Sequence, residues 1–140
     1  MQLKNHPFLY VSLTLNALVV FPLTILLLIV KPERMVEVYG PDSEARRILA
    51  SIYFAIGVAS VAAMFRRGDN MINMAFPIFY LQIIYKIMTA FTVGFPNPVV
   101  ISNVAISAFH MMTMFLVVQQ QKANQEGSVE EEKEHPQEAT

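Results

Sequence analysis

Four long apolar runs constrain this chain of 140 residues more than any other feature. A soluble protein of this size needs polar helix faces that meet water, yet polar residues are nearly absent within each run. A helix of about 20 apolar residues is what is needed to cross the hydrocarbon core of a bilayer, which is about 30 Å thick. The sequence therefore predicts four transmembrane spans, at residues 9–30, 47–65, 71–93 and 99–118.

The same runs decide between helices and strands. Inside lipid the backbone must satisfy its own hydrogen bonds, so a single chain can cross as helices or as a closed barrel. The strict alternation of a barrel strand is missing, and four strands could not close. The expected fold is all-α: a polytopic membrane protein with an antiparallel four-transmembrane-helix bundle as one domain over residues 1–118.

The segments between and after the runs have distinct characters. Residues 66–70 and 94–98 are short polar or proline-rich turns that allow only an antiparallel return. Residues 32–39 have one apolar side and one charged side, which predicts a short helix in the membrane interface. Residues 119–140 are acidic and poor in apolar side chains, which predicts a disordered tail.

Composition excludes several functions. The net charge of −1 gives no basic face, so we expect no nucleic-acid partner. The chain has no cysteine, which excludes thiol redox chemistry, thiolate metal sites and iron–sulfur clusters. His110 is the one histidine inside a predicted span, and a haem held by two histidines would need another. We therefore expect no metal, no cofactor and no catalytic residue.

Two residues of the first span bear on helix packing. Asn16 lies near the middle of the span, where an amide is expected to hydrogen-bond a neighbouring helix. Pro22 removes one backbone hydrogen bond, and we expect a kink there.

Small residues recur at every fourth position of the second span. A ridge of this kind lets two helix backbones approach closely. We expect its partner inside the same chain, with a homodimer or another membrane protein as the alternative. The ridge consists of Ser51, Ala55, Ala59 and Ala63.

Lys86 is the charged residue that lies inside a predicted span rather than at its edge. An antiparallel return through the turn at Pro96 places the residue of equal depth near Ile106 in the fourth span. Polar residues of the two spans would then face each other around Lys86. The candidate ligand-binding pocket consists of Gln82, Tyr85, Lys86, Asn103, Ser107 and His110.

A structural role for Lys86 stands beside this interpretation. A lysine side chain can extend along a helix and place its ammonium among lipid headgroups. Four carboxylates that could pair with it lie on that side of the predicted membrane, namely Glu33, Glu37, Asp42 and Glu44. No Asp or Glu lies within a span, so the chain lacks the embedded carboxylate on which small four-helix drug antiporters depend. His110 likewise has a plain role as a hydrogen-bonded core histidine.

Basic residues flanking the spans bear on orientation. One side of the predicted membrane holds Lys4, Arg66, Arg67 and Lys122, and the other holds Lys31, Arg34, Arg46 and Arg47. The counts are equal, and the free amino terminus favours placing both termini in the cytoplasm. We expect a multi-pass protein of a bacterial inner membrane.

Several short motifs resemble those of small bacterial membrane proteins of the DoxX-like and BphX-like kind. The motifs are Pro32-Glu33-Arg34, Tyr39-Gly40, Arg46 or Arg47 at the start of the second span, and Tyr85-Lys86 in the third. The resemblance covers residues 8 to 118 and implies an integral membrane protein with a four-helix fold.

Three functional hypotheses follow. The first is a non-enzymatic accessory or assembly component of a membrane complex, with contacts through the small-residue ridge. The second is a carrier or binder of a lipid or amphipathic anion held by Lys86. The third is an enzyme acting on a lipid-soluble substrate with His110 as acid or base, for which no second catalytic group is evident.

Overall fold

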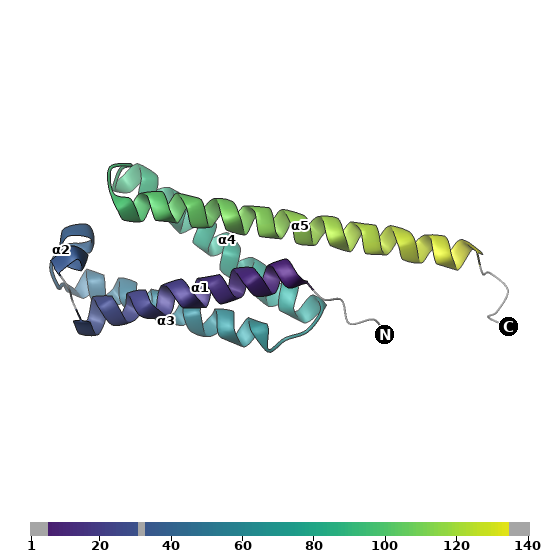
Figure 1. Ribbon diagram of the computed structural model, residues 1–140, viewed down its shortest axis with the longest axis horizontal. Helices are drawn as coiled ribbons and strands as arrows, with labels where there is room; N and C mark the ends of the chain where they lie inside the picture. Colours follow the sequence, from purple (N-terminus) through teal and green to yellow (C-terminus); the bar gives the residue numbers. More distant parts are fainter. Residues whose placement is uncertain (1–5, 31–32, 135–140) are drawn as a thin grey trace.

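The computed structural model describes residues 6–30 and 33–134, with side chains up to residue 127. Within these ranges the chain is all-helical and contains no strand (Figure 1). Its elements are α1 (Pro7–Ile25), the π-helical segment η1 (Leu26–Val30), α2 (Glu33–Tyr39), α3 (Glu44–Met64), α4 (Asp69–Thr92) and α5 (Pro98–Glu134).

Four helical stretches are long and apolar enough to cross a membrane, which confirms that part of the prediction. Each one matches a predicted span and begins a few residues before it. The stretches are Pro7–Val30, Glu44–Met64, Asp69–Thr92 and Pro98–Gly127.

Local chemistry explains where the helices begin. Pro7 occupies the first turn of α1, where its missing N–H and fixed φ cost nothing. Ser43 caps α3 by accepting a hydrogen bond from the Arg46 backbone N–H at 3.3 Å, and Glu44 complements the helix dipole in the first turn. Gly68, at φ 55°, supplies the left-handed residue that the tight turn before α4 requires.

The helices pack as two pairs, α1 with α3 and α4 with α5. Figure 1 shows the two pairs approaching each other near the start of α1 and separating toward α2. Two hydrogen-bonded contacts join α1 to α5 where the pairs meet: His6 with Gln120 at 3.1 Å and Ser12 with His110 at 2.9 Å. Asn16 donates to Ser60 at 2.7 Å, so its predicted interhelical hydrogen bond is confirmed.

The apolar core has two parts. The larger cluster lies where the pairs converge and includes Leu9, Leu13, Met71, Phe79 and Val117. The smaller cluster lies toward α2 and consists of Val20, Leu27, Ala50 and Tyr53. Between and beside these clusters the interior is polar. Its buried polar side chains include Ser12, Asn16, Ser60, Gln82, Lys86, Asn103, Ser107, His110 and Thr113.

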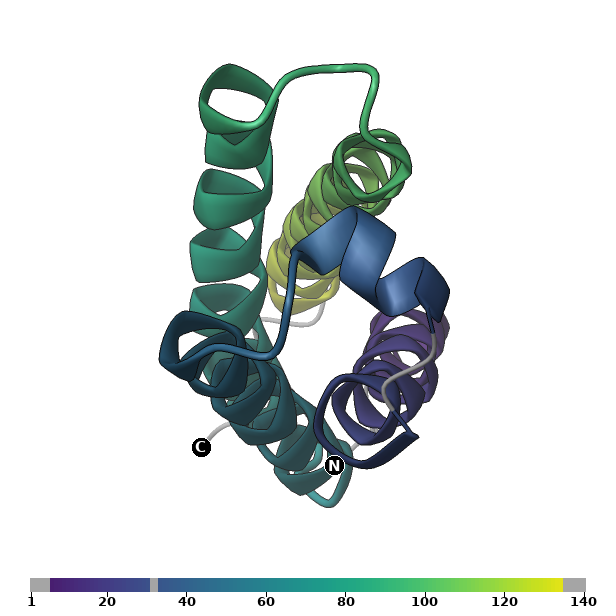
Figure 2. The ribbon, with the colours of Figure 1, turned by 90° about the vertical axis from the view of Figure 1, so that its left-hand side faces the viewer.

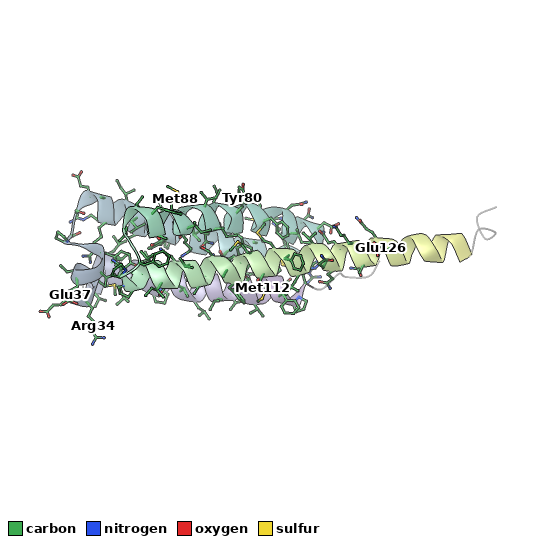
Figure 3. All side chains as sticks on the ribbon, turned by 90° about the horizontal axis from the view of Figure 1, so that it is seen from above. Arg34, Glu37, Tyr80, Met88, Met112 and Glu126 are labelled. Atoms are coloured by element: carbon green, nitrogen blue, oxygen red, sulfur yellow. The ribbon has the colours of Figure 1, made fainter. Side chains whose placement is uncertain are left out.

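The outer surface is largely apolar along the long helices up to residue 118 of α5. Phe65 and Phe91 are 82% and 80% exposed. Tyr80, Met88 and Met112 project outward from α4 and α5, whereas the charged Arg34 and Glu37 project from the α2 end (Figure 3). Polar groups inside and apolar groups outside are the reverse of a water-soluble protein, in which exposed apolar patches are small.

The short helix α2 lies across one end of the long helices (Figure 2). It matches the short helix predicted over residues 32–39, except that Pro32 lies outside the described residues, as do Lys4 and Lys31. Asn97 in the α4–α5 turn donates to the Val38 carbonyl at 3.3 Å. Gly40, at φ 80°, turns the chain from α2 toward α3.

Pro22 lies inside α1, which continues to Ile25 and then changes to the π-helical segment η1. A π-helical turn shifts backbone hydrogen bonding by one residue and leaves carbonyls for other donors. Arg46 of α3 supplies such a donor, since its Nη2 donates to the Leu27 carbonyl at 3.2 Å. The irregularity therefore begins one turn after the proline.

The structure differs from the disordered tail that we expected from residue 119 onward. Helix α5 continues without interruption to Glu134, and residues 135–140 lie outside the described residues. Residues 119–134 are mostly Gln, Glu, Lys and Ala, which are good helix formers. Extending an existing helix also avoids the cost of nucleating a new one.

The structure also differs from the expectation that the small-residue ridge of α3 packs inside the chain. Ser51 and Ala55 are exposed, Ala59 is half-buried and only Ala63 is buried. At about 100° per residue, the opposite side of the helix packs inward. It carries Ala50, Tyr53, Gly57 and Ser60. This side faces the interior because its polar groups form hydrogen bonds there, as Ser60 does with Asn16. The expectation of in-chain packing was therefore wrong for Ser51 and Ala55.

Candidate functional site

Two side-chain contacts fix how α4 and α5 face each other. Lys86 Nζ donates to Asn103 Oδ1 at 3.0 Å. The rings of Phe79 and His110 stack with centroids 4.4 Å apart and planes 12° from parallel. Phe79 lies seven residues before Lys86 in α4, and its partner His110 lies seven residues after Asn103 in α5. These two helices therefore run in opposite directions. Asn103, rather than a residue near Ile106, lies at the depth of Lys86.

Lys86 is a buried cation without a counter-charge among the described residues. Its side chain is 4% exposed, and no described carboxylate forms an ion pair with it. Besides Asn103, it approaches the Tyr85 ring, with Nζ 5.3 Å from the ring centroid. The side chain does not extend to the surface as the snorkelling alternative requires. Burying an ammonium without an anion costs several kcal/mol.

Asn103 holds the lysine in place. Its Oδ1 accepts from Lys86, and its Nδ2 donates to Thr89 Oγ1 at 3.1 Å. Thr89 in turn donates to the Lys86 carbonyl at 2.6 Å, which closes a ring of hydrogen bonds between α4 and α5. The ring fixes the base of the lysine side chain and leaves the ammonium further donors.

Lys86 lines a cavity of about 390 Å³ between α1 and α5, below α2. Its walls are mainly apolar, and Pro22 of α1 and Ser102 of α5 are exposed at its edge. The cavity thus opens between Pro22 and Ser102, onto the apolar outer surface of the long helices. The lining residues from α1 are Val19, Val20, Pro22, Leu23 and Leu26; α2 adds Met35, Val38 and Tyr39; α3 and α4 add Tyr53 and Lys86; and Pro98, Val99, Ser102, Asn103 and Ile106 come from α5.

A second cavity, of about 260 Å³, lies beside the first. Tyr39, Tyr53 and Asn103 line both cavities and form part of the wall between them. Burial raises the pKa of Tyr39 above its usual range, and the Tyr53 phenol raises it further, so Tyr39 stays neutral. Tyr85 lines the second cavity only.

The six predicted pocket residues are divided by the structure. Lys86 and Asn103 line the larger cavity, and Tyr85 and Asn103 line the smaller one. The other three are buried between the helices and line neither of these two cavities: Gln82, Ser107 and His110.

Gln82 and His110 are deep in the interior with hydrogen-bonding capacity to spare. Gln82 is 1% exposed, and neither atom of its amide has a partner among the described residues. His110 is fully buried, hydrogen-bonded to Ser12 through Nδ1 and without a partner at Nε2. In the part of the chain described, no group of three His, Asp or Glu side chains could hold a metal ion.

Sequence reasoning missed the residues that close the site from α1, α2 and α3. Tyr39 and Tyr53 belong to elements whose rotation the sequence leaves undecided, although two tyrosines near a predicted membrane interface were a usable signal. The apolar wall from α1 gave no signal, since residues 17–23 are all apolar whether they face lipid or a cavity.

Comparison of this chain with protein families, with curated proteins and with solved structures finds no match. The resemblance to DoxX-like and BphX-like proteins therefore stays a prediction.

Proposed function

We propose that this chain is a multi-pass membrane protein that binds an amphipathic anion in the cavity at Lys86. The proposed arrangement is an antiparallel bundle of four transmembrane helices in a bacterial inner membrane, with both termini cytoplasmic. Support for the membrane comes from the apolar outer surface, on which residues such as Phe65 and Phe91 are exposed.

One observation carries the binding proposal: a buried ammonium without a carboxylate lies in the lining of an otherwise apolar cavity. An anion that enters the cavity supplies the missing counter-charge, and in a low-dielectric interior this interaction is strong. An apolar tail on the same ligand fits the walls from α1 and α5. Ionisable residues inside membrane proteins are commonly functional.

The ligand enters sideways from the lipid in this proposal. Pro22 and Ser102, on either side of the opening, are exposed where the apolar surface meets the cavity. The anionic group lies at Lys86, and the tail follows Leu23 of α1 or Ile106 of α5 toward the bilayer. At about 30 Å³ for each water-sized group, the cavity accommodates a headgroup and the start of a chain but not a whole two-chain lipid.

Native mass spectrometry of gently extracted protein tests the proposal. We expect the wild-type chain to retain an anionic lipid and Lys86→Met to lose it, because methionine keeps the apolar volume but removes the charge. Lys122→Met is the matched control, since Lys122 is exposed on α5. Wild-type protein without any bound anionic lipid, or full retention by Lys86→Met, contradicts the proposal.

A second candidate function is an accessory or assembly role in a membrane complex. It is supported by Ser51 and Ala55, small residues that are exposed on the outer side of α3 rather than packed inside the chain. Small residues on a lipid-facing surface let another transmembrane helix approach closely. The mass of the gently extracted complex tests this candidate, and a single chain without a partner contradicts it.

A further inference from the structure

We infer that the bound anion is a phospholipid whose phosphate carries a polyhydroxyl headgroup, with phosphatidylglycerol as the representative. The inference rests on the proposed function and adds the smaller cavity to the site. In this arrangement the phosphate lies at Lys86, the acyl chains leave through the larger cavity, and the hydroxyl-bearing headgroup occupies the smaller cavity.

The two cavities are adjacent. They share five lining residues: Val38, Tyr39, Tyr53, Val99 and Asn103. Tyr39 lines both cavities, and in this arrangement a rotation of its side chain connects them. Asn103 also lines both cavities and holds Lys86. A ligand at the ammonium is therefore already at the entrance to the second cavity.

The smaller cavity has a mainly apolar surface, and the hydrogen-bonding groups among its lining residues are neutral. Six of its eleven lining residues carry one: Tyr39, Tyr53, Tyr85, Thr89, Asn97 and Asn103. No Lys, Arg, Asp or Glu lines it. A second anionic group would have no counter-charge there, whereas alcohol hydroxyls can both donate and accept.

Tyr85 supplies the hydrogen-bonding group that is still available. Its hydroxyl is buried and has no partner among the described residues, whereas Thr89 and Asn97 are already hydrogen-bonded. Its ring centroid is 5.3 Å from Lys86 Nζ, so the ammonium and the phenol lie within the reach of one headgroup. A buried hydroxyl without a partner is unfavourable, and a headgroup hydroxyl satisfies it.

Size supports the same occupant. A volume of about 260 Å³ corresponds to about nine water-sized groups at about 30 Å³ each. This is enough for a glycerol unit and too little for an acyl chain.

The test is lipid competition, monitored by native mass spectrometry of the full chain in detergent. Phosphatidylglycerol and phosphatidylethanol with identical acyl chains are offered in equal amounts, because both are phosphodiesters with one negative charge and only phosphatidylglycerol carries headgroup hydroxyls. We expect wild-type protein to favour phosphatidylglycerol about tenfold, the effect of one hydrogen bond to an otherwise unsatisfied buried group. Tyr85→Phe should abolish this preference and leave phosphatidylethanol binding unchanged, which also shows that the variant is folded.

Tyr80→Phe is the matched control, because Tyr80 lies on the same helix and points outward (Figure 3). Equal binding of the two lipids by wild-type protein, or a preference that survives in Tyr85→Phe, overturns the inference while leaving the proposed function intact. Failure of wild-type protein to bind either lipid instead contradicts the proposed function. Soluble glycerophosphoglycerol, which lacks acyl chains, should not compete with the lipids. Effective competition would assign the site to a soluble phosphodiester and overturn the inference that the ligand is a lipid.

Discussion

Two buried cationic side chains, Lys86 and Arg46, lie toward the end of the molecule that α2 covers. Lys86 faces a cavity, whereas Arg46 is used structurally. The Arg46 guanidinium donates to the Gly40 carbonyl at 2.9 Å and to the Leu27 carbonyl at 3.2 Å. It thereby ties the beginning of the π-helical segment and the turn after α2 to the start of α3. This position keeps α2 over the cavities.

Replacing Arg46 with methionine should lower the free energy of unfolding by about 1.5–3 kcal/mol. The variant loses two hydrogen bonds from a charged donor, and the Gly40 and Leu27 carbonyls lose that donor. Thermal unfolding in detergent, followed by circular dichroism, measures the change.

Arg47→Met is the adjacent control. The Arg47 side chain is 62% exposed and pairs with Asp42 at the surface at 2.9 Å. Exposed ion pairs contribute little, so this variant should unfold like the wild type. Equal effects of the two substitutions would show that the buried contacts of Arg46 do not hold the structure.

Helix α3 has two sides with different roles. The inner side carries Gly57, where an added Cβ would lie 2.9 Å from the Phe21 ring of α1. The outer side carries the exposed Ala55. Gly57 therefore permits the close approach of α1 and α3, whereas Ala55 of the small-residue ridge takes no part in it.

Leucine placed at the two positions distinguishes the sides. Gly57→Leu should lower the free energy of unfolding by about 1–3 kcal/mol through overpacking, measured by thermal unfolding in detergent. Ala55→Leu should leave unfolding of the single chain unchanged. If α3 also packs on a partner, Ala55→Leu should reduce the mass of the extracted complex. Destabilisation of the single chain by Ala55→Leu would contradict the orientation of α3.

The elements themselves were largely predictable. Runs of apolar residues located the four long helices. The rotation of α3 was not, because Ser51 and Ala55 suit close packing as well as Gly57 and Ser60 do. The continuation of α5 past residue 118 was missed because composition was given more weight than helix propensity.

For the molecule as a whole, the interior combines apolar clusters with buried polar side chains, and large apolar side chains are exposed on the surface. Lys86, Gln82 and His110 are buried, while Phe65 and Phe91 are exposed. Facing polar residues on α4 and α5 could be predicted from the short turn between these helices, and Lys86 and Asn103 do meet. The cavity could not be predicted, because it depends on how far the α1–α3 pair separates from the α4–α5 pair.

The central claim is that four helices cross a bilayer. Because the chain has no native cysteine, single cysteines can replace exposed residues at the two ends of the helices and be labelled by a membrane-impermeant maleimide. Exposed positions suited to this are Arg67, Phe95, Glu37 and Lys122. In intact bacterial cells the account predicts labelling of cysteines at positions 37 and 95 from outside, and of those at 67 and 122 only after permeabilisation. Positions 67 and 95 labelled from the same side would contradict it.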